Sequence, residues 1–245
     1  MTEKIVHISD LHAKDPRVDF NAYRRSRKIC KRIAKQENPE TTIVVITGDL
    51  GWGMSREEKT LIMRMLYPLK KAKFPVLICK GNHDHGPKGL LRMQANVDRF
   101  ADIVEAICGH KHRPPEDPHT TEFGPWLFIN LNTSWDQTFL SRGHVGDEQY
   151  KAIQNIIEET DLDPIIYGHH CPSGGNVGLR LSDRDKAKEY FDGCKLWLSG
   201  HLHRSRMWSN TFGTEYLVAA PMTPREQKYQ KIWFNDKGVI QWEWN

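Results

Sequence analysis

The chain has 245 residues, a formal net charge of +4 and a mean hydropathy of −0.63. Its length suits one large domain or two small ones, and no apolar run approaches the roughly 20 residues of a membrane-spanning helix. The mild excess of basic residues is compatible with a phosphate-bearing substrate but is too small to indicate nucleic-acid binding by itself.

The start of the chain and its cysteines bear on where the protein works. The first predicted strand begins almost at the N-terminus, so we expect no signal peptide. The five cysteines are scattered and form no C-x-x-C pair, which is typical of reduced thiols. We therefore expect a cytoplasmic protein that makes no membrane contact.

Five short apolar runs predict strands, and each run ends in glycine or polar residues. Their hydrophobicity is nearly continuous rather than alternating, which is typical of strands buried on both faces. The runs cover residues 5–9, 42–47, 75–79, 164–167 and 195–199. A sixth strand of the same kind is predicted at residues 126–132.

Apolar residues at helical spacing separate these strands. They predict helices over residues 20–36, 55–72 and 147–160, with a further helical stretch at 97–107. Ser55 and Glu58 have the spacing of a capping box, which marks the beginning of the second helix.

The last third of the chain has a different pattern. Strands are predicted at residues 215–220, 229–235 and 239–245, and the turn residues 235–238 join the last two. Alternating strands and helices followed by antiparallel strands predict an α/β layered fold. Because no linker or repeat interrupts the sequence, we expect a single domain over residues 1–245.

Polar side chains follow five of the predicted strands, at the carboxyl ends where functional groups gather in layered α/β folds. In an extended chain residues i and i+2 point the same way, so Asp10 with His12 is expected to aim two side chains into one pocket, as is His201 with His203. Seven oxygen and nitrogen donors without a thiolate are too many for one tetrahedral ion, and suit two metal ions about 3.5–4 Å apart that share a carboxylate. The seven candidate ligands are Asp10, His12, Asp49, Asn82, His169, His201 and His203. A glycine precedes four of them and is expected to allow sharp turns and close approach.

The motifs D-x-H, GD, GNHD, GHH and GHLH, in that order, resemble those of the calcineurin-like metallophosphoesterases over residues 5–203. The resemblance implies a four-layer fold, a two-sheet β-sandwich flanked by helices, in which the strands after His203 complete the second sheet. It implies two metal ions bridged by a hydroxide that acts as the nucleophile. One ion would be held by Asp10, His12 and His203, the other by Asn82, His169 and His201, with Asp49 bridging.

The same resemblance implies catalytic roles for two further residues of the GNHD motif. His83 would face the leaving group and donate a proton to it, and Asp84 would orient His83. The family usually uses the first histidine of a GHH pair, so His169 is preferred to His170 as a ligand. Imidazole and carboxylate donors together allow Mn, Fe, Zn or Co.

Within the family, the segments ISDLHA, TGDL, GNHD, GHHCP and GHLHR look most like the class III cyclic-nucleotide phosphodiesterase branch. Two departures lie at the expected entrance to the site. Gly51-Trp52 stands where the family often carries Thr-Asp, and Cys171 stands where it often carries the first proline of His-His-Pro-Pro. The expected activity is hydrolysis of phosphodiester bonds in small nucleotides or related molecules. The alternatives are a DNA or RNA nuclease, a phosphomonoesterase, or a non-catalytic scaffold, which the complete ligand set argues against.

Several other residues remain candidates for substrate contact or for separate sites. Trp52 and Trp135 could stack on a base, and His170 and Arg180 could contact the substrate. Residues 109–112, GHKH, have the same G-H-x-H pattern as the GHLH motif. Together with Cys108 and His119 they could form a zinc site, but we prefer to interpret them as a solvated loop. The basic run over residues 24–35 is interpreted as the solvent-exposed face of a helix rather than as a nucleic-acid-binding surface. His7 is interpreted as a hydrogen-bonded core histidine.

Overall fold

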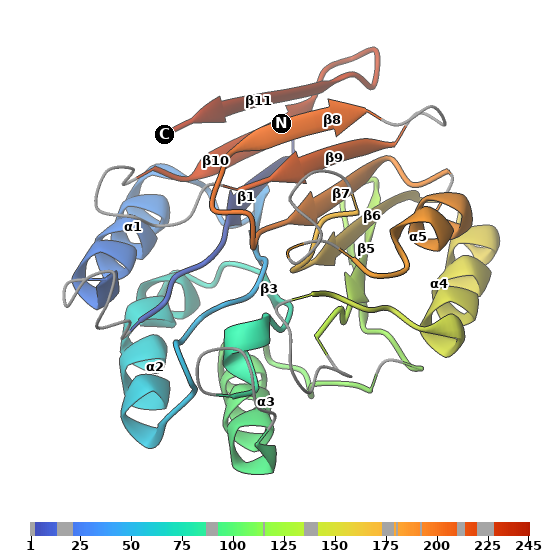
Figure 1. Ribbon diagram of the computed structural model, residues 1–245. Helices are drawn as coiled ribbons and strands as arrows, with labels where there is room; N and C mark the ends of the chain where they lie inside the picture. The colour runs from blue at the N-terminus through green and yellow to red at the C-terminus, as the bar shows by residue number, and fades with distance from the viewer. Residues whose placement is uncertain are drawn as a thin grey trace.

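The computed structural model describes residues 3–13, 22–86, 93–114, 116–134, 142–172, 179, 181–191, 193–209, 214–219 and 228–245. Two β-sheets pack face to face in it, and helices cover the outer face of each sheet (Figure 1). This four-layer arrangement confirms the predicted α/β fold class.

The first sheet combines a parallel core with an antiparallel hairpin. In spatial order its strands are β11 (Ile240–Trp244), β10 (Gln230–Phe234), β1 (Lys4–Ile8), β2 (Thr42–Ile46) and β3 (Val76–Ile78). β1, β2 and β3 are parallel, whereas β10 runs antiparallel to β1 and pairs with β11.

The second sheet is parallel in its centre and antiparallel at both edges. In spatial order its strands are β4 (Thr120–Phe123), β5 (Trp126–Leu131), β6 (Asp163–Gly168), β7 (Leu196–Ser199), β9 (Glu215–Val218) and β8 (Arg206–Ser209). Only the edge strands β4 and β8 run antiparallel to their neighbours.

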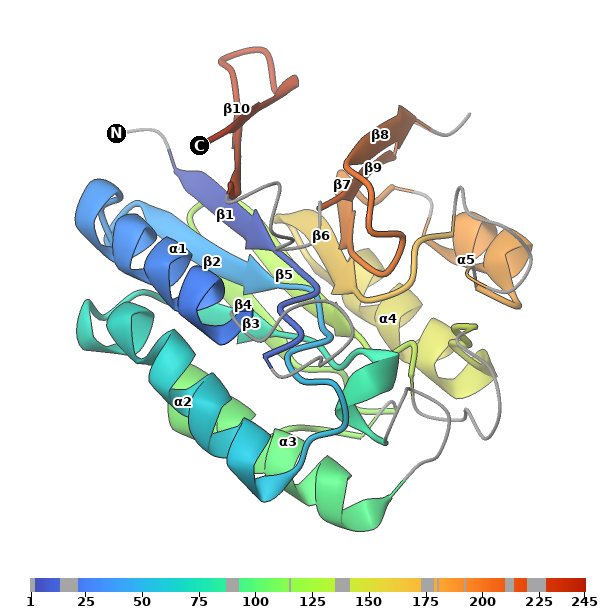
Figure 2. The same cartoon turned by 60° about the vertical axis from the view of Figure 1, so that its left-hand side comes forward.

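Helices cover the outer faces of both sheets, as Figure 2 shows from a second direction. The first sheet is covered by α1 (Ala22–Gln36), α2 (Arg56–Lys71) and α3 (Gln94–Cys108), and the second by α4 (Asp147–Glu159) and α5 (Arg184–Tyr190). Across the described residues, no helix combines the length and apolarity that crossing a bilayer requires.

Strand residues alternate between two apolar layers, which explains the nearly continuous hydrophobic runs. In β2, Ile43 and Val45 pack into the core between the two sheets, while Val44 and Ile46 pack against the helices. All five residues of this strand are buried. Because both faces of each central strand are covered, a polar residue inside such a strand would need a buried partner.

His7 is such a residue, and the structure confirms that it is a hydrogen-bonded core histidine. Its Nδ1 donates to the side-chain oxygen of Gln230 at 3.0 Å, and its Nε2 lies 2.9 Å from Oγ1 of Thr47. These contacts join β10, β1 and the end of β2. Burial lowers the pKa of His7 to about 4, so the ring stays neutral.

The expectation that the strands after His203 complete the second sheet is wrong for the last two. β8 and β9 do join that sheet, but β10 and β11 extend the first one beside β1. The sequences of β10 and β11 do not show which sheet the two strands join, because the pairing partners of a strand are set by long-range contacts. The elements β4, β8 and α5 were not predicted, since short strands at the edge of a sheet and a charged seven-residue helix carry no long apolar run.

Candidate metal centre

The candidate ligands meet at the seam between the two sheets. Each of them follows the carboxyl end of a strand: β1, β2 and β3 in the first sheet, β6 and β7 in the second. The first sheet supplies Asp10, His12, Asp49 and Asn82, and the second supplies His169, His201 and His203. All of them except His203 are buried, and the half-exposed ring of His203 marks the solvent side of the site.

The backbone at five of the seven candidate ligands is left-handed rather than extended. Positive φ angles occur at Asp10 (53°), His12 (42°), Asp49 (53°), His201 (65°) and His203 (50°). The premise that D-x-H and H-x-H are extended is therefore wrong, although Asp10 and His12 do lie in one group of candidate ligands. A left-handed conformation at a residue with a Cβ costs about 1–3 kcal/mol, and such residues cluster at functional sites.

Two glycines allow the backbone of one loop to touch the ligands of another. A Cβ on Gly81 would lie 2.2 Å from Oδ1 of Asp49, and a Cβ on Gly200 would lie 1.8 Å from Oγ of Ser9 and 2.7 Å from Oδ2 of Asp10. No side chain fits in either space. Gly200 therefore lets the two sheets approach closely enough to share one site.

Asp10, His12 and His203 form the first group of candidate ligands. Nε2 of His203 lies 3.2 Å from Oδ1 of Asp10 and 3.2 Å from Nε2 of His12. One ligand atom from each of the three residues lies within 4.8 Å of the other two. These are the residues expected to share one ion.

Asn82, His169 and His201 form the second group, with Asp49 beside them. Nε2 of His169 lies 3.1 Å from Oδ1 of Asn82, 3.1 Å from Nδ1 of His201 and 3.3 Å from Oδ2 of Asp49. The same Asp49 oxygen lies 3.9 Å from Nε2 of His12 in the first group. Asp49 thus stands between the two groups, as a bridging ligand would.

The charges in the site are coupled through Asp10 and Asp49. Burial alone would raise the pKa of each carboxyl, but neighbouring histidines outweigh burial and hold both pKa values below their usual range. Burial lowers the pKa of His169, yet Asp49 and Asp10 raise it to about 9 overall. Burial lowers the pKa of His12 and, more strongly, that of His201. Two buried carboxylates therefore attract positive charge into the seam.

His169 is oriented by a residue that the sequence did not single out. Its Nδ1 donates a hydrogen bond to the carbonyl of Thr47 at 2.7 Å, which leaves Nε2 facing Asp49 and Asn82. The same carbonyl accepts a bond from Oγ of Ser9 at 3.0 Å. A backbone carbonyl that holds one ring nitrogen commonly fixes a histidine for metal binding through the other. Thr47 belongs to the TGD segment, but its carbonyl carries no side-chain signal.

The donor set fits two metal ions. Two ligand nitrogens bound to one ion at about 2.0–2.1 Å lie roughly 3 Å apart. The His12–His203 and His169–His201 nitrogen pairs, at 3.2 and 3.1 Å, have this separation. Without a cation, one nitrogen of each pair must carry a proton, because two unprotonated nitrogens this close would repel each other. The opposite ring nitrogens, Nδ1 of His12 and Nε2 of His201, are buried without hydrogen-bond partners among the described residues, so these rings are not held from behind as His169 is.

His83 lies at the edge of the ligand groups and stacks on Trp52. The two rings are 4.1 Å apart and inclined by 23°. Nδ1 of His83 lies 3.3 Å from the carbonyl of Trp52, and its backbone N–H donates to Oδ1 of Asp49 at 2.9 Å. One face of Trp52 is therefore already occupied by His83.

Asp84 does not orient His83, contrary to what the resemblance implied. Its Oδ1 accepts the backbone N–H groups of Leu50 and Gly51 at 2.8 and 3.2 Å, and its Oδ2 accepts that of Gly81 at 2.9 Å. Burial, followed by the nearby Asp49, raises the pKa of Asp84 to about 7, while the backbone bonds oppose this rise. Asp84 ties the loop of Asp49 to the loop of Asn82.

Glu58 is a second carboxylate that the sequence assigned only in part. The predicted capping box is present, with Ser55 and Glu58 each bonding the other's backbone N–H. Oε1 of Glu58 also accepts the backbone N–H groups of Trp52 and Gly53, at 2.7 and 3.2 Å. Glu58 thus holds the loop that carries Trp52 against His83.

The remaining candidates fall at different distances from the site. His170 is buried beside it, with its ring 4.3 Å from that of His201 and Nδ1 2.7 Å from Oγ1 of Thr133. Trp135 and Arg180 lie outside the described residues.

The alternative GHKH segment lies elsewhere. The rings of His110 and His119 stack at 3.5 Å, and His112 packs edge-on against Phe100. All three histidines are partly buried rather than fully solvated. In the described parts of the chain, this segment contributes no group of three candidate metal ligands.

Comparisons with known proteins agree with this geometry. The sequence matches the model of a protein family described as calcineurin-like phosphoesterase over residues 3–205. No curated protein matches the sequence. Among solved structures, a dimetal phosphatase from Danio rerio has a TM-score of 0.73 at 10% identity, covering 96% of this chain and 93% of its own.

Two further solved structures show the same likeness. A protein from Thermus thermophilus has a TM-score of 0.61 at 12% identity, with 99% of each chain covered. A purple acid phosphatase from yellow lupin (Lupinus luteus) has a TM-score of 0.66 at 14% identity, covering 100% of this chain and 51% of its own. This chain therefore spans about half of the lupin enzyme, and identities this low show a shared fold only.

Proposed function

Because the chain belongs to the calcineurin-like phosphoesterase family, as the match over residues 3–205 shows, we propose that it is a metal-dependent phosphodiesterase. The family membership implies a hydrolase of phosphoric esters. The proposal adds the bond type, a phosphodiester, and the substrate class, small nucleotides or related molecules. It also retains the class III cyclic-nucleotide branch, which the motif spelling supports, and a cytoplasmic location.

The observation that carries the proposal is the surface beside Asp49. The segment Gly51-Trp52-Gly53 places an indole, not a cation, at the edge of the ligand groups, where Trp52 packs edge-on against His12 and face-on against His83. A phosphomonoester dianion gains from an additional cation at such a place. A diester carries a single negative charge, which two metal ions and His83 can balance.

The proposed ligand roles follow the two groups in the seam. Asp10, His12 and His203 would hold one ion, Asn82, His169 and His201 the other, and Asp49 would contact both. Bound cations of this kind lower the pKa of a water molecule towards neutrality and offset charge on phosphoryl oxygens. The metals compatible with these donors are Mn, Fe, Zn and Co.

His83 is proposed as the proton donor to the leaving oxygen. Its Nδ1 faces the carbonyl of Trp52, so Nε2 is the nitrogen left for a substrate. The ring is only partly buried and lies within reach of His12 and Asp49. The proton on Nε2 would neutralise an alkoxide as it departs, and Trp52 would keep the ring from turning away.

A comparison of substrates tests the bond type. Bis-nitrophenyl phosphate and a cyclic nucleotide would be assayed against nitrophenyl phosphate and duplex DNA, with Mn and at two salt concentrations. We expect the small diesters to give the larger kcat/KM. A tenfold or greater preference for the monoester would assign a phosphomonoesterase instead, and faster, salt-sensitive loss of the duplex would assign a nuclease.

A leaving-group series tests the role of His83. His83→Ala should retain metal and slow a poor alkoxide leaving group by about 10²–10⁴-fold, because general acid catalysis is worth that much. An activated nitrophenolate needs less protonation and should slow much less. Equal slowing of both substrates at full metal content would show that His83 acts through position or charge rather than by proton donation.

A further inference from the structure

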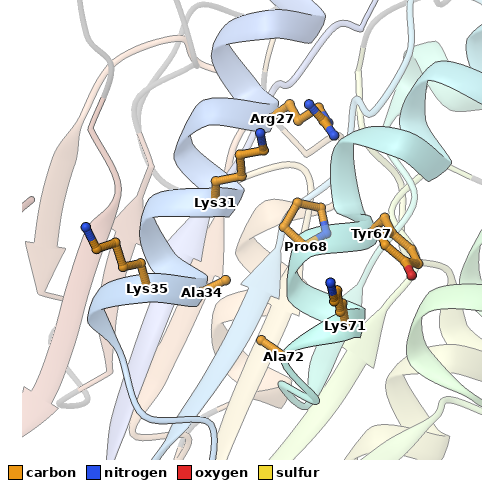
Figure 3. A pocket seen from close by; sticks show the side chains of 8 residues that line it. All are labelled: Arg27, Lys31, Ala34, Lys35, Tyr67, Pro68, Lys71 and Ala72. Atoms are coloured by element: carbon orange, nitrogen blue, oxygen red, sulfur yellow. The ribbon is translucent and has the colours of Figure 1, made fainter.

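A basic groove lies between α1 and α2, on the outer side of the helical layer that covers the first sheet. Its volume is about 580 Å³. In Figure 3, Arg27 and Lys31 lie on α1 towards α2, Pro68 lies on α2 towards α1, and Lys35 and Tyr67 stand at the outer sides of the two helices. We use the name basic groove for the surface formed by Arg27, Lys31, Lys35, Tyr67, Pro68 and Lys71.

The positive charge of this surface is not balanced by its surroundings. Helix α1 carries seven Lys and Arg residues and no acidic residue. In the part of the chain that the structure describes, Arg27, Lys31, Lys35 and Lys71 have no ion-pair partner. The Arg27 Nε donates only to the backbone carbonyl of Arg64, at 3.3 Å, so its charge stays uncompensated.

Folding does not require these cations, because the other face of α1 makes the core contacts. Ile29, Cys30 and Ile33 are buried against the first sheet and α2. Exposed like charges at spacings of three and four residues repel one another and weaken an isolated helix by a few tenths of a kcal/mol per pair. A surface with this cost and no folding role is a candidate for binding an anion.

Contrary to the sequence-based interpretation of residues 24–35 as a solvated helix face, we propose that the basic groove binds the sugar–phosphate backbone of a single-stranded nucleic acid. Arg27, Lys31 and Lys35 repeat every four residues, which places them about 6 Å apart along the helix axis. A row of cations can therefore meet successive phosphates of an extended strand. Tyr67, on the outer side of α2, is 56% exposed and offers a ring on which a base can stack.

The surroundings of the groove favour this partner over two others. A membrane-binding helix inserts an apolar face, but the apolar face of α1 is already buried in the core. A duplex presents its phosphates outside and keeps its bases stacked inside, so the exposed ring of Tyr67 can stack only on the unpaired bases of a single strand.

The basic groove shares no residue with the metal centre. β1 and β2 are parallel and α1 connects them, so α1 begins at the end of the sheet that carries the site and runs away from it. Lys35 and Lys71, near the C-terminal ends of their helices, lie towards the opposite end of the sheet. Strand binding at the groove is therefore separate from the chemistry at the metal centre and does not depend on the proposed function.

Fluorescence anisotropy with a labelled oligothymidylate tests the proposal at salt concentrations from about 50 to 200 mM. The triple variant Lys31→Gln, Lys35→Gln, Lys71→Gln should bind at least about tenfold more weakly at the lowest salt. The slope of log affinity against log salt concentration should be about 2 smaller in magnitude for this variant. Each of the three lost phosphate contacts removes roughly 0.7 from the slope for a single strand. Gel electrophoresis of the oligonucleotide after each titration shows whether it is still full length, so that hydrolysis is not mistaken for a change in binding.

The matched control is Lys111→Gln, Lys151→Gln, Lys237→Gln, three exposed lysines on other surfaces. Both triple variants lower the formal net charge from +4 by three, to +1. The control should keep the wild-type affinity and slope. Tyr67→Ala should weaken binding about fivefold or more without changing the slope, because stacking releases no counterions.

Three results would overturn the proposal. Equal weakening by both triple variants would mean that only net charge matters. A wild-type protein that does not bind the oligonucleotide at the lowest salt would have no such site. If polyglutamate competes as well as oligothymidylate at equal charge, and Tyr67→Ala has no effect, the groove binds acidic protein instead.

Discussion

At the scale of single residues, buried carboxylates in the metal centre have different tasks. Asp10 and Asp49 face imidazole nitrogens, whereas Asp84 and Glu58 face only backbone N–H groups. Asp10 and Asp49 also accept backbone N–H groups, from His201 and His83, but Asp84 and Glu58 accept only such groups and so hold loops in place. The residues around each carboxylate, rather than its type, decide whether it binds or positions.

The first prediction concerns Asp49, which faces both ligand groups. Asp49→Asn replaces a charged oxygen by an amide and should lower the occupancy of both metal positions, whereas Asn82→Ala removes a neutral donor from the second group only. Turnover should therefore fall further in Asp49→Asn. Elemental analysis of both variants checks this, and an Asp49→Asn protein with wild-type metal content would contradict it.

The second prediction concerns Glu58, which holds the Trp52 loop. Glu58→Gln loses charged acceptors for the N–H groups of Trp52, Gly53 and Ser55, and should reduce stability by roughly 1–3 kcal/mol. Because Trp52 stacks on His83, kcat for a poor leaving group should fall while KM and metal content stay near wild type. The neighbouring exposed Glu57→Gln is the control. A change in KM alone would mean that the loop binds substrate and does not position His83.

At the scale of secondary structure elements, buried polar side chains connect strands that lie side by side. The His7–Gln230 bond joins β1 to β10, and the His7–Thr47 bond joins β1 to the end of β2. The carbonyl of Thr47 in turn orients His169 from the second sheet. A histidine in the core thus connects the pairing of strands to the geometry of the metal centre.

The third prediction follows from the pKa of His7, which burial lowers to about 4. Below about pH 6.5 the unfolded chain gains a proton at this position that the folded chain does not, so the stabilising contribution is complete above pH 6.5 and is lost as pH falls towards 4. Between pH 7.5 and 5 the loss is about 2 kcal/mol.

Urea unfolding of wild type and His7→Gln across this range measures the effect. The variant has no titrating ring, so its deficit in stability relative to wild type should shrink as pH falls. A deficit that is the same at every pH would show that His7 is protonated in the folded protein or that its contribution does not depend on its charge.

At the scale of the whole molecule, the metal centre joins two separately covered sheets. Four candidate ligands come from the first sheet and three from the second, and the close approach at Gly200 brings them together. Metal ions bound in this seam would connect the two halves of the sandwich, so ligand geometry and packing of the sheets depend on each other.

The fourth prediction tests this dependence. Gly200→Ala introduces a Cβ 1.8 Å from Oγ of Ser9, which must push the seam apart. Metal content and thermal stability should both fall, and added metal should raise the unfolding temperature less than in wild type. Gly109→Ala is the control for a substitution away from the seam: its Cβ would meet nothing within 4 Å, although its φ of +81° adds a local strain that Gly200 does not have. If both variants lose metal and stability alike, the close approach at Gly200 does not explain the loss.

The fold class and the list of candidate ligands follow from local patterns. Buried strands such as Thr42–Ile46 need continuous apolar runs, and the polar residues that interrupt them at strand ends are visible without any coordinates. Edge elements such as β4 and β8 were missed because one covered face leaves no such run. The pairing of β10 with β1 was missed because it depends on contacts as distant as His7 and Gln230.

The sequence by itself determined the layered architecture and which side chains are candidate ligands, because burial and strand ends leave marks within a few residues of each other. The tertiary structure decided how those side chains are aimed. The left-handed backbone at Asp10 and His201, the carbonyl of Thr47 that turns His169, and the use of Asp84 as a loop tie all arise where segments distant in sequence meet. A backbone amide or carbonyl is the same in every residue, so its role can be assigned only when its partner is in place.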